Sequence, residues 1–68
     1  MNRILKQIKF YLRKSKEYKD LLESNICDKT KNEYNRIAND YLRKSRILLN
    51  NYPELEEEIE EYKDNLFK

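Results

Sequence analysis

Side chains that can do covalent or acid–base chemistry are scarce in this sequence. Histidine is absent and Cys27 is the only cysteine, so neither a Ser–His nor a Cys–His pair can be assembled. A zinc site needs several Cys or His ligands, and a phosphate-binding loop needs glycine, which is also absent. We therefore predict a non-enzymatic protein that binds no metal ion or cofactor.

Carboxylates are the one reactive group that is concentrated in the chain. Residues 54–64 contain six glutamates and Asp64. Such groups can bind a divalent cation or transfer protons, but a chain of 68 residues offers little concave surface to desolvate them. The sequence therefore predicts a solvated acidic face in preference to a catalytic or metal-binding one.

Apolar residues recur every three or four positions in three segments, which is typical of amphipathic helices. With no glycine and one proline, the chain also lacks the turn residues that successive β-hairpins need. We expect helices over about residues 2–25, 31–51 and 53–67. The apolar seam of the last helix is Leu55, Ile59, Tyr62 and Leu66.

Two local signals place the helix boundaries. Thr30 followed by Glu33 matches a capping box, whose side chains bond to free backbone N–H groups, and Asp28 is the competing cap. Pro53 cannot continue a helix but suits the first turn of the next one. The second helix is therefore expected to begin at about Lys31 and the third at Pro53.

The three helices indicate one domain over residues 1–68, an all-α, up-down-up three-helix bundle. The alternative fold is a helical hairpin of the first two helices that dimerises into a four-helix-type bundle. The six tyrosines are expected at the margin of the core, because each hydroxyl must reach water or a partner. Ser15 and Ser45 are small residues on apolar faces and mark places where two helices can approach closely.

The segment Tyr-Leu-Arg-Lys-Ser occurs twice, at residues 11–15 and 41–45. It can record an internal duplication of one helix, or it can arise by chance in a chain of such biased composition. The frequent use of Lys, Asn, Ile and Tyr is itself typical of AT-rich genomes, including those of many phages and other viruses.

Charge is divided unequally along the chain. Residues 1–52 contain 13 lysines and arginines against 6 acids, whereas residues 53–68 contain 2 against 7. The acidic segment holds like-charge pairs four residues apart, which weaken an isolated helix. We predict that the last helix lies beside the basic N-terminal half of the first. The charges should fix its position and direction more than they add stability.

The last helix is too short to cover the whole hairpin formed by the first two. The end near their connection should stay uncovered, and it holds the candidate partner-binding residues Leu22, Ile26, Tyr34 and Ile37. Phe10 is a further candidate because it lies off the apolar stripe among basic residues, although a plainer interpretation is that it packs on the last helix. Cys27, beside the uncovered end, can cross-link a dimer or be an inert thiol.

We favour a protein-binding module, such as an adaptor, inhibitor or regulator from a phage or mobile element, that acts through helix-face contacts and can self-associate. The alternative is nucleic-acid binding through the basic face of the first helix, by Arg3, Lys6, Lys9, Arg13 and Lys14. The second alternative is membrane-surface association through the same helix. Because no long apolar run and no export signal is visible, we expect a cytoplasmic, intracellular protein.

Overall fold

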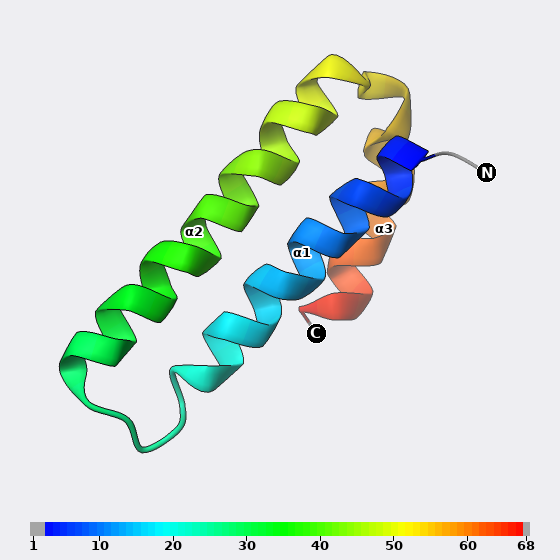
Figure 1. The fold of residues 1–68 in the computed structure, drawn as a ribbon. Helices are drawn as coiled ribbons and strands as arrows, with labels where there is room; N and C mark the ends of the chain where they lie inside the picture. The colour runs from blue at the N-terminus through cyan, green and yellow to red at the C-terminus, as the bar shows by residue number, and fades with distance from the viewer. Residues whose placement is uncertain (1–2, 68) are drawn as a thin grey trace.

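The structure is a computed structural model that describes residues 3–67 of the chain. Helix α1 spans Arg3–Leu21, α2 spans Asp28–Asn51, a single 3₁₀ turn (η1) spans Pro53–Leu55, and α3 spans Glu56–Leu66. α1 and α2 run antiparallel, and α3 turns back beside α1 (Figure 1). The predicted all-α, up-down-up bundle is confirmed.

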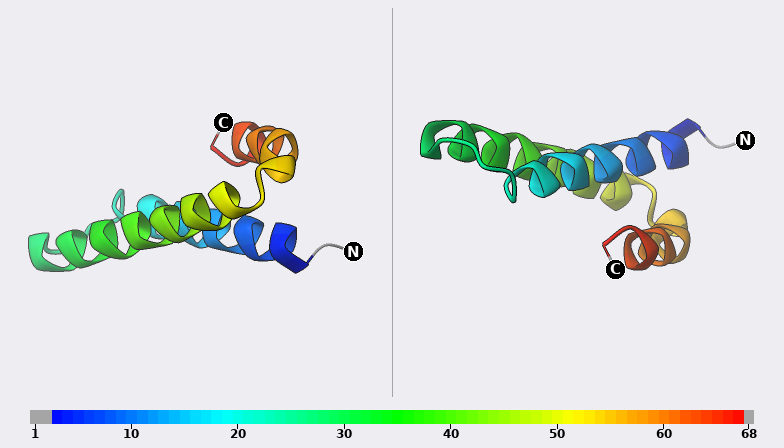
Figure 2. Two further views of the ribbon diagram at one scale, coloured as in Figure 1. Left: turned by 90° about the horizontal axis from the view of Figure 1, so that it is seen from above. Right: turned by 90° about the horizontal axis from the view of Figure 1, so that it is seen from below.

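The helices form two layers (Figure 2). α1 and α2 lie side by side in one layer, and α3 lies on one face of it, tilted relative to both. α3 has 11 residues against 19 in α1 and 24 in α2, so it reaches only part of the hairpin. We call the end beside α3 the covered end and the end with the α1–α2 connection the uncovered end (Figure 1). The resulting molecule is elongated, with principal extents of 40 × 21 × 16 Å.

The core lies where α3 meets the hairpin. Ile8 and Leu12 of α1 cluster with Leu55 of η1 and Ile59 of α3, and all four side chains are buried. The partly buried residues packed around this cluster are Ile4, Leu5, Leu42, Leu48, Leu49, Tyr62 and Leu66. The apolar residues of all three helices contribute to this core, because a spacing of three and four residues places them on the inward face of each helix.

α1 and α2 approach each other through small residues. Ser15, Ala38 and Ser45 are buried in the hairpin, as predicted for the two serines. The Ser45 hydroxyl donates a hydrogen bond of 2.7 Å to the Leu42 carbonyl, whereas Ser15 Oγ has no hydrogen-bond partner within the described part of the chain. A buried hydroxyl without a partner is destabilising, so the packing uses the small volume of Ser15 and not its polarity.

The first helix ends earlier than its apolar stripe predicts. α1 stops at Leu21 instead of about Asn25. The N–H groups of residues 22, 23 and 24 bond to carbonyls only three residues back, so the last turn tightens and the chain reverses. Leu22 and Ile26 therefore lie in the connection and outside the helix, which corrects the prediction. The predicted start at Asn2 lies outside the described residues.

The second helix begins earlier than the sequence predicts. Asp28 is its first residue and Cys27 its N-cap, and the Lys31 N–H bonds to the Cys27 carbonyl at 3.0 Å in the first turn. The predicted capping box is wrong, because Thr30 lies inside the helix with its hydroxyl 3.1 Å from Cys27 Sγ. The extended backbone of Cys27 supplies the non-helical geometry that an N-cap requires.

Pro53 separates α2 from the final segment, as predicted. It opens η1, which continues directly into α3, and α3 ends at Leu66, one residue before the predicted Phe67. The first turn of α3 contains Glu56, Glu57 and Glu58. The helix dipole favours negative charge at this place, which supports a helix start that has no side-chain cap.

α3 lies beside the basic first half of α1, which is the predicted position (Figure 1). Close ion pairs do not hold it there. Between residues 3 and 67, the ion pairs within 4.0 Å are Lys14–Glu17 and Lys16–Asp20, both inside α1. The Lys9 ammonium instead lies 5.3 Å from the centre of the Tyr62 ring on α3.

Candidate functional site

The uncovered end carries the four residues predicted for it. α3 does not reach the α1–α2 connection (Figure 1). The four side chains there are all half-buried, and we call them the hairpin tip: Leu22, Ile26, Tyr34 and Ile37. Tyr34 and Ile37 are three residues apart on α2 and share one face of it, whereas Leu22 and Ile26 belong to the connection.

Five aromatic rings follow one edge of the α1–α2 interface. The centre of the Phe10 ring lies 6.0 Å from that of Tyr11, which lies 6.0 Å from Tyr41 across the interface. The centre of the Tyr18 ring is 6.2 Å from Tyr41 and 5.5 Å from Tyr34. We call this set the aromatic row: Phe10, Tyr11, Tyr41, Tyr18 and Tyr34. It joins two predicted candidates, Phe10 and Tyr34, that are far apart in the sequence.

The aromatic row has a signal in the sequence. Tyr11 and Tyr18 are seven residues apart on α1, and Tyr34 and Tyr41 are seven apart on α2. Seven residues complete about two helical turns, so each pair projects from one edge of its helix. From the sequence, Tyr11, Tyr18 and Tyr41 are expected only at the margin of the core. The alignment of α1 against α2 then brings the three rings together on one surface.

The row lies on the face of the α1–α2 layer that is opposite α3. At about 100° per residue, Tyr11 projects roughly 60° to one side of Ile8, while Leu12 projects roughly 40° to the other side. Leu12 clusters with Ile59 of α3, so the α3 layer lies on the Leu12 side. The rings on the opposite side therefore have no third helix over them (Figure 2). We call this side the row face.

The row is amphipathic and partly exposed. Its four tyrosines are half-buried, and Phe10 is 40% exposed. Gln7 Nε2 donates a hydrogen bond of 3.1 Å to the Tyr11 hydroxyl. The ammonium groups of Lys14 and Lys44 lie over the row, 5.7 Å from the centre of Phe10 and 5.6 Å from that of Tyr41. The row thus offers aromatic area with polar groups at its rim.

Three of the five predicted nucleic-acid contacts share a shallow hollow. Lys6, Lys9 and Arg13 line it together with Phe10 and Tyr62, and its volume is about 430 Å³. Among residues 3–67, no acid lines this hollow and no carboxylate lies within 4.0 Å of its three cations. The hollow combines positive charge with two aromatic rings, and we call it the basic hollow.

The other two basic candidates lie elsewhere. Arg3 is exposed at the start of α1, away from the lining of the basic hollow. Lys14 lies over Phe10, with its ammonium 3.2 Å from the Glu17 carboxylate. Phe10 borders both groups of cations. It lines the hollow together with Tyr62 of α3, and its ring contact is with Tyr11.

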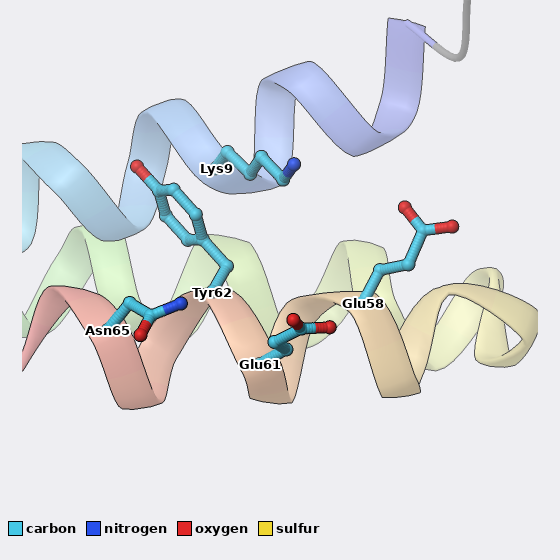
Figure 3. Close-up of a pocket in the computed structure, with 5 residues that line it drawn as sticks. All are labelled: Lys9, Glu58, Glu61, Tyr62 and Asn65. Atoms are coloured by element: carbon cyan, nitrogen blue, oxygen red, sulfur yellow. The ribbon is translucent and has the colours of Figure 1, made fainter.

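A second hollow separates α1 from the acidic side of α3 (Figure 3). It has a volume of about 290 Å³ and is lined by Lys9, Glu58, Glu61, Tyr62 and Asn65. The Tyr62 side chain projects from α3 toward α1, beside Lys9. The two carboxylates share this hollow with Lys9 without forming a close ion pair, so α3 lowers the positive potential on one flank of the basic hollow.

Cys27 is an exposed free thiol at the start of α2. The Thr30 hydroxyl, 3.1 Å from Sγ, lowers the pKa of the Cys27 thiol, and the backbone N–H of Thr30 acts in the same direction. Hydrogen bonds and a helix N-terminus both stabilise a thiolate. This environment favours a reactive thiol over the inert one considered from the sequence.

The acidic side of α3 has no arrangement suited to a metal ion. Within the part of the chain that the structure describes, no three His, Cys, Asp or Glu side chains are grouped so as to hold one. The described helices also include none with the length and apolar character needed to cross a bilayer.

Comparison with known proteins adds no relative. No known protein family matches the chain, and neither curated proteins nor solved structures show significant similarity to it. A function for this chain must therefore be argued from the row face, the hairpin tip and the basic hollow.

Proposed function

We propose that the chain is a small, non-enzymatic protein-binding module whose row face receives a helix of another protein. The observation that supports this most is the continuous aromatic row on a helical face without a third helix over it. Tyrosine provides a large, rigid contact area with a polar end, and it is enriched among residues that dominate binding energy. The hairpin tip extends the same surface with Ile37, next to Tyr34 on α2.

Binding at this face needs little rearrangement. The rings already contact one another, so few side chains lose freedom when a partner arrives. An amphipathic helix laid along the α1–α2 interface can place its apolar positions on the rings. Lys44, at the rim, is then available to a carboxylate of that helix, whereas Lys14 is already paired with Glu17. We assign the role of an intracellular adaptor, inhibitor or regulator to such a module.

Site-directed photo-crosslinking in cells of the organism that encodes the chain tests this function. A benzophenone amino acid replaces Tyr41 in the middle of the row and, in the matched control, Lys63 on the exposed side of α3. We expect protein adducts from position 41 that are missing from position 63. Equal labelling from the two positions, or none from position 41, contradicts the proposal.

Nucleic-acid binding is the second candidate, and the basic hollow favours it. Its cations can contact phosphates while the rings of Phe10 and Tyr62 stack on unpaired bases. The affinity for single-stranded RNA or DNA should then fall steeply with salt, and Arg13→Gln should reduce the salt dependence by about one phosphate contact. No binding at about 50 mM salt would exclude this candidate.

Membrane-surface association through α1 is not proposed. It requires the apolar face of α1 to be free, whereas Ile8 and Leu12 are buried in the core. Phe10 is the main apolar side chain that α1 still exposes near the basic residues. Liposome co-sedimentation should accordingly recover little of the chain.

A further inference from the structure

The single chain exposes more surface than a compact protein of its size. Its accessible surface is 5385 Å², whereas a compact monomer of 8.5 kDa exposes about 4,700 Å². Its radius of gyration is 13.0 Å, against about 11 Å for a compact domain of 68 residues. The excess of about 700 Å² is in keeping with the elongated shape of the chain.

Several apolar side chains of the hairpin lie on or beside the row face, although Ile47, 55% exposed, projects from α2 away from α1. Leu21 of α1 is 41% exposed and projects away from the α3 layer, whereas Phe10, 40% exposed, lies at the margin of the row face and also lines the basic hollow with Tyr62 of α3. Ile37 and Tyr41, both half-buried, project to the same side from α2. On the α3 side of the uncovered end, the corresponding positions are Lys16, Lys19 and Lys31. The row face therefore gains more from being covered by apolar side chains than the α3 side of the uncovered end does.

The charges that border the row face nearly cancel. By helical position its cations are Arg3, Lys14, Lys29 and Lys44 and its anions are Glu17, Glu33 and Asp40, while Lys6 and Arg13 of the basic hollow lie beyond Phe10 at the margin of the face. Two copies of the chain can meet at this face without strong repulsion. The other charged surfaces lack this property, because the basic hollow repels its own copy and so does the acidic side of α3.

We propose that a second copy of this chain covers the row face and forms a two-fold symmetric homodimer. The inference rests on the proposed function, since it names a second copy as the helical protein that binds there. In a two-fold pair the same residues of both copies meet. The two hairpins then form a four-helix arrangement, with the aromatic rows at its centre and one α3 on each outer side.

The areas involved agree with such a dimer. A standard protein interface buries about 800 Å² of each partner, and each copy exposes about 700 Å² more than a compact monomer. An interface of standard size thus removes about as much area from each copy as this excess. It also gives the uncovered end a second apolar layer, which a small domain without disulfides needs.

Sedimentation equilibrium of the full chain under reducing conditions tests the inference. We expect twice the chain mass of 8.5 kDa at roughly 100 µM, well above a micromolar Kd. Phe10→Glu should raise the Kd at least about tenfold, because it places a charge among the paired rings. Phe67→Glu is the matched control: Phe67 is 42% exposed at the end of α3, on the other layer, so the Kd should change less than about twofold.

A second variant keeps the test independent of folding defects. Circular dichroism establishes that each variant keeps its helices. Ile37→Glu, between Tyr34 and Tyr41 on α2, should weaken the dimer at least as much as Phe10→Glu. A chain that stays monomeric up to about 1 mM overturns the inference, and so does a dimer that Phe67→Glu weakens as strongly as Phe10→Glu.

Crosslinking from position 41 separates a failure of this inference from a failure of the proposed function. An adduct of twice the chain mass supports both. Adducts with other proteins alone overturn the homodimer and leave the protein-binding function standing. A lack of any adduct contradicts the binding function and the homodimer together.

Discussion

The two ends of the α1–α2 hairpin differ in what closes them. At the covered end, α3 supplies a second layer, and the large side chains of Ile8, Leu12 and Ile59 are buried. Toward the α1–α2 connection, large side chains are only half-buried, and the buried ones are the small Ser15 and Ala38. A two-helix layer can therefore bury small side chains between its backbones, but large ones need a second layer.

This difference is matched by residue type. The covered end uses aliphatic side chains, which have no polar atom and can be sealed from water. The row face uses tyrosines, whose rings pack while their hydroxyls stay near solvent. A partner can cover such rings while the tyrosine hydroxyls stay in contact with water. In the proposed function, stability and binding therefore depend on different side chains of α1 and α2.

Removing a core side chain at the covered end should have the largest effect. Ile59→Ala leaves a cavity between α3 and α1, and we expect it to lower the free energy of unfolding by about 2–5 kcal/mol. For so small a domain this is a large part of the total stability. Urea unfolding followed by circular dichroism measures the loss. Glu60→Ala, at an exposed neighbour on α3, should change the stability by less than about 0.5 kcal/mol. If both variants lost as much, the α3 contact would not be the core.

Ser15→Ala should instead stabilise the less covered half of the hairpin. Ser15 Oγ is buried without a partner in the described structure, so removing it relieves a desolvation penalty. We expect the free energy of unfolding to rise by about 1 kcal/mol. Ser45→Ala is the matched control, since it makes the same change in α2 but loses the bond to the Leu42 carbonyl. Its gain should be smaller, and equal gains would show that the Ser15 hydroxyl has a partner in solution.

The fold and the covered core could be predicted because both depend on periodicity. Ile8, Leu12 and Ile59 recur at helical spacing, and three amphipathic stripes have few ways to be buried together. The division of charge also placed α3 beside the basic half of α1. The actual contact, the Lys9 ammonium over the Tyr62 ring, depends on side-chain rotamers, which charge patterns do not specify.

The connection and the row face were less predictable because they depend on local geometry and on register. Thr30 and Glu33 match a capping box, but the chain reversal is completed with Cys27 in the extended N-cap geometry. The seven-residue spacing of tyrosines gives an edge on each helix. Only the antiparallel register shows that Tyr11 meets Tyr41, and one sequence contains no direct record of that register.

The contact between Lys9 and Tyr62 allows a finer test of the covered end. Lys9→Met keeps most of the side-chain stem and removes the charge, so we expect a loss of about 0.5 kcal/mol, the value for a partly exposed cation–π contact. In the described structure no carboxylate lies within 4.0 Å of Lys9. The loss should therefore persist between about 50 mM and 500 mM salt. If this loss of stability disappeared at high salt, Lys9 would form an ion pair with Glu58 or Glu61 in solution.

The smallest change concerns the start of α2, where Thr30→Val removes one hydroxyl beside Cys27. The Thr30 hydroxyl lowers the pKa of the Cys27 thiol, so the thiolate of the native chain persists to lower pH than an ordinary one. Thr30→Val should raise this pKa, which shifts the pH dependence of alkylation by iodoacetamide to higher pH and slows the reaction near neutrality. At pH values above both pKa values the two rates should converge.

Alkylation followed by mass spectrometry over a range of pH measures this shift, and Thr30→Ser is the control because it keeps the hydroxyl. The stability of the fold should not change measurably, since the thiol is exposed. If the profile of Thr30→Val coincided with that of the native chain, the backbone N–H groups at the start of α2 would be setting the thiolate population. The Thr30 hydroxyl would then have no part in it, and the reactivity of Cys27 would follow from its N-cap position alone.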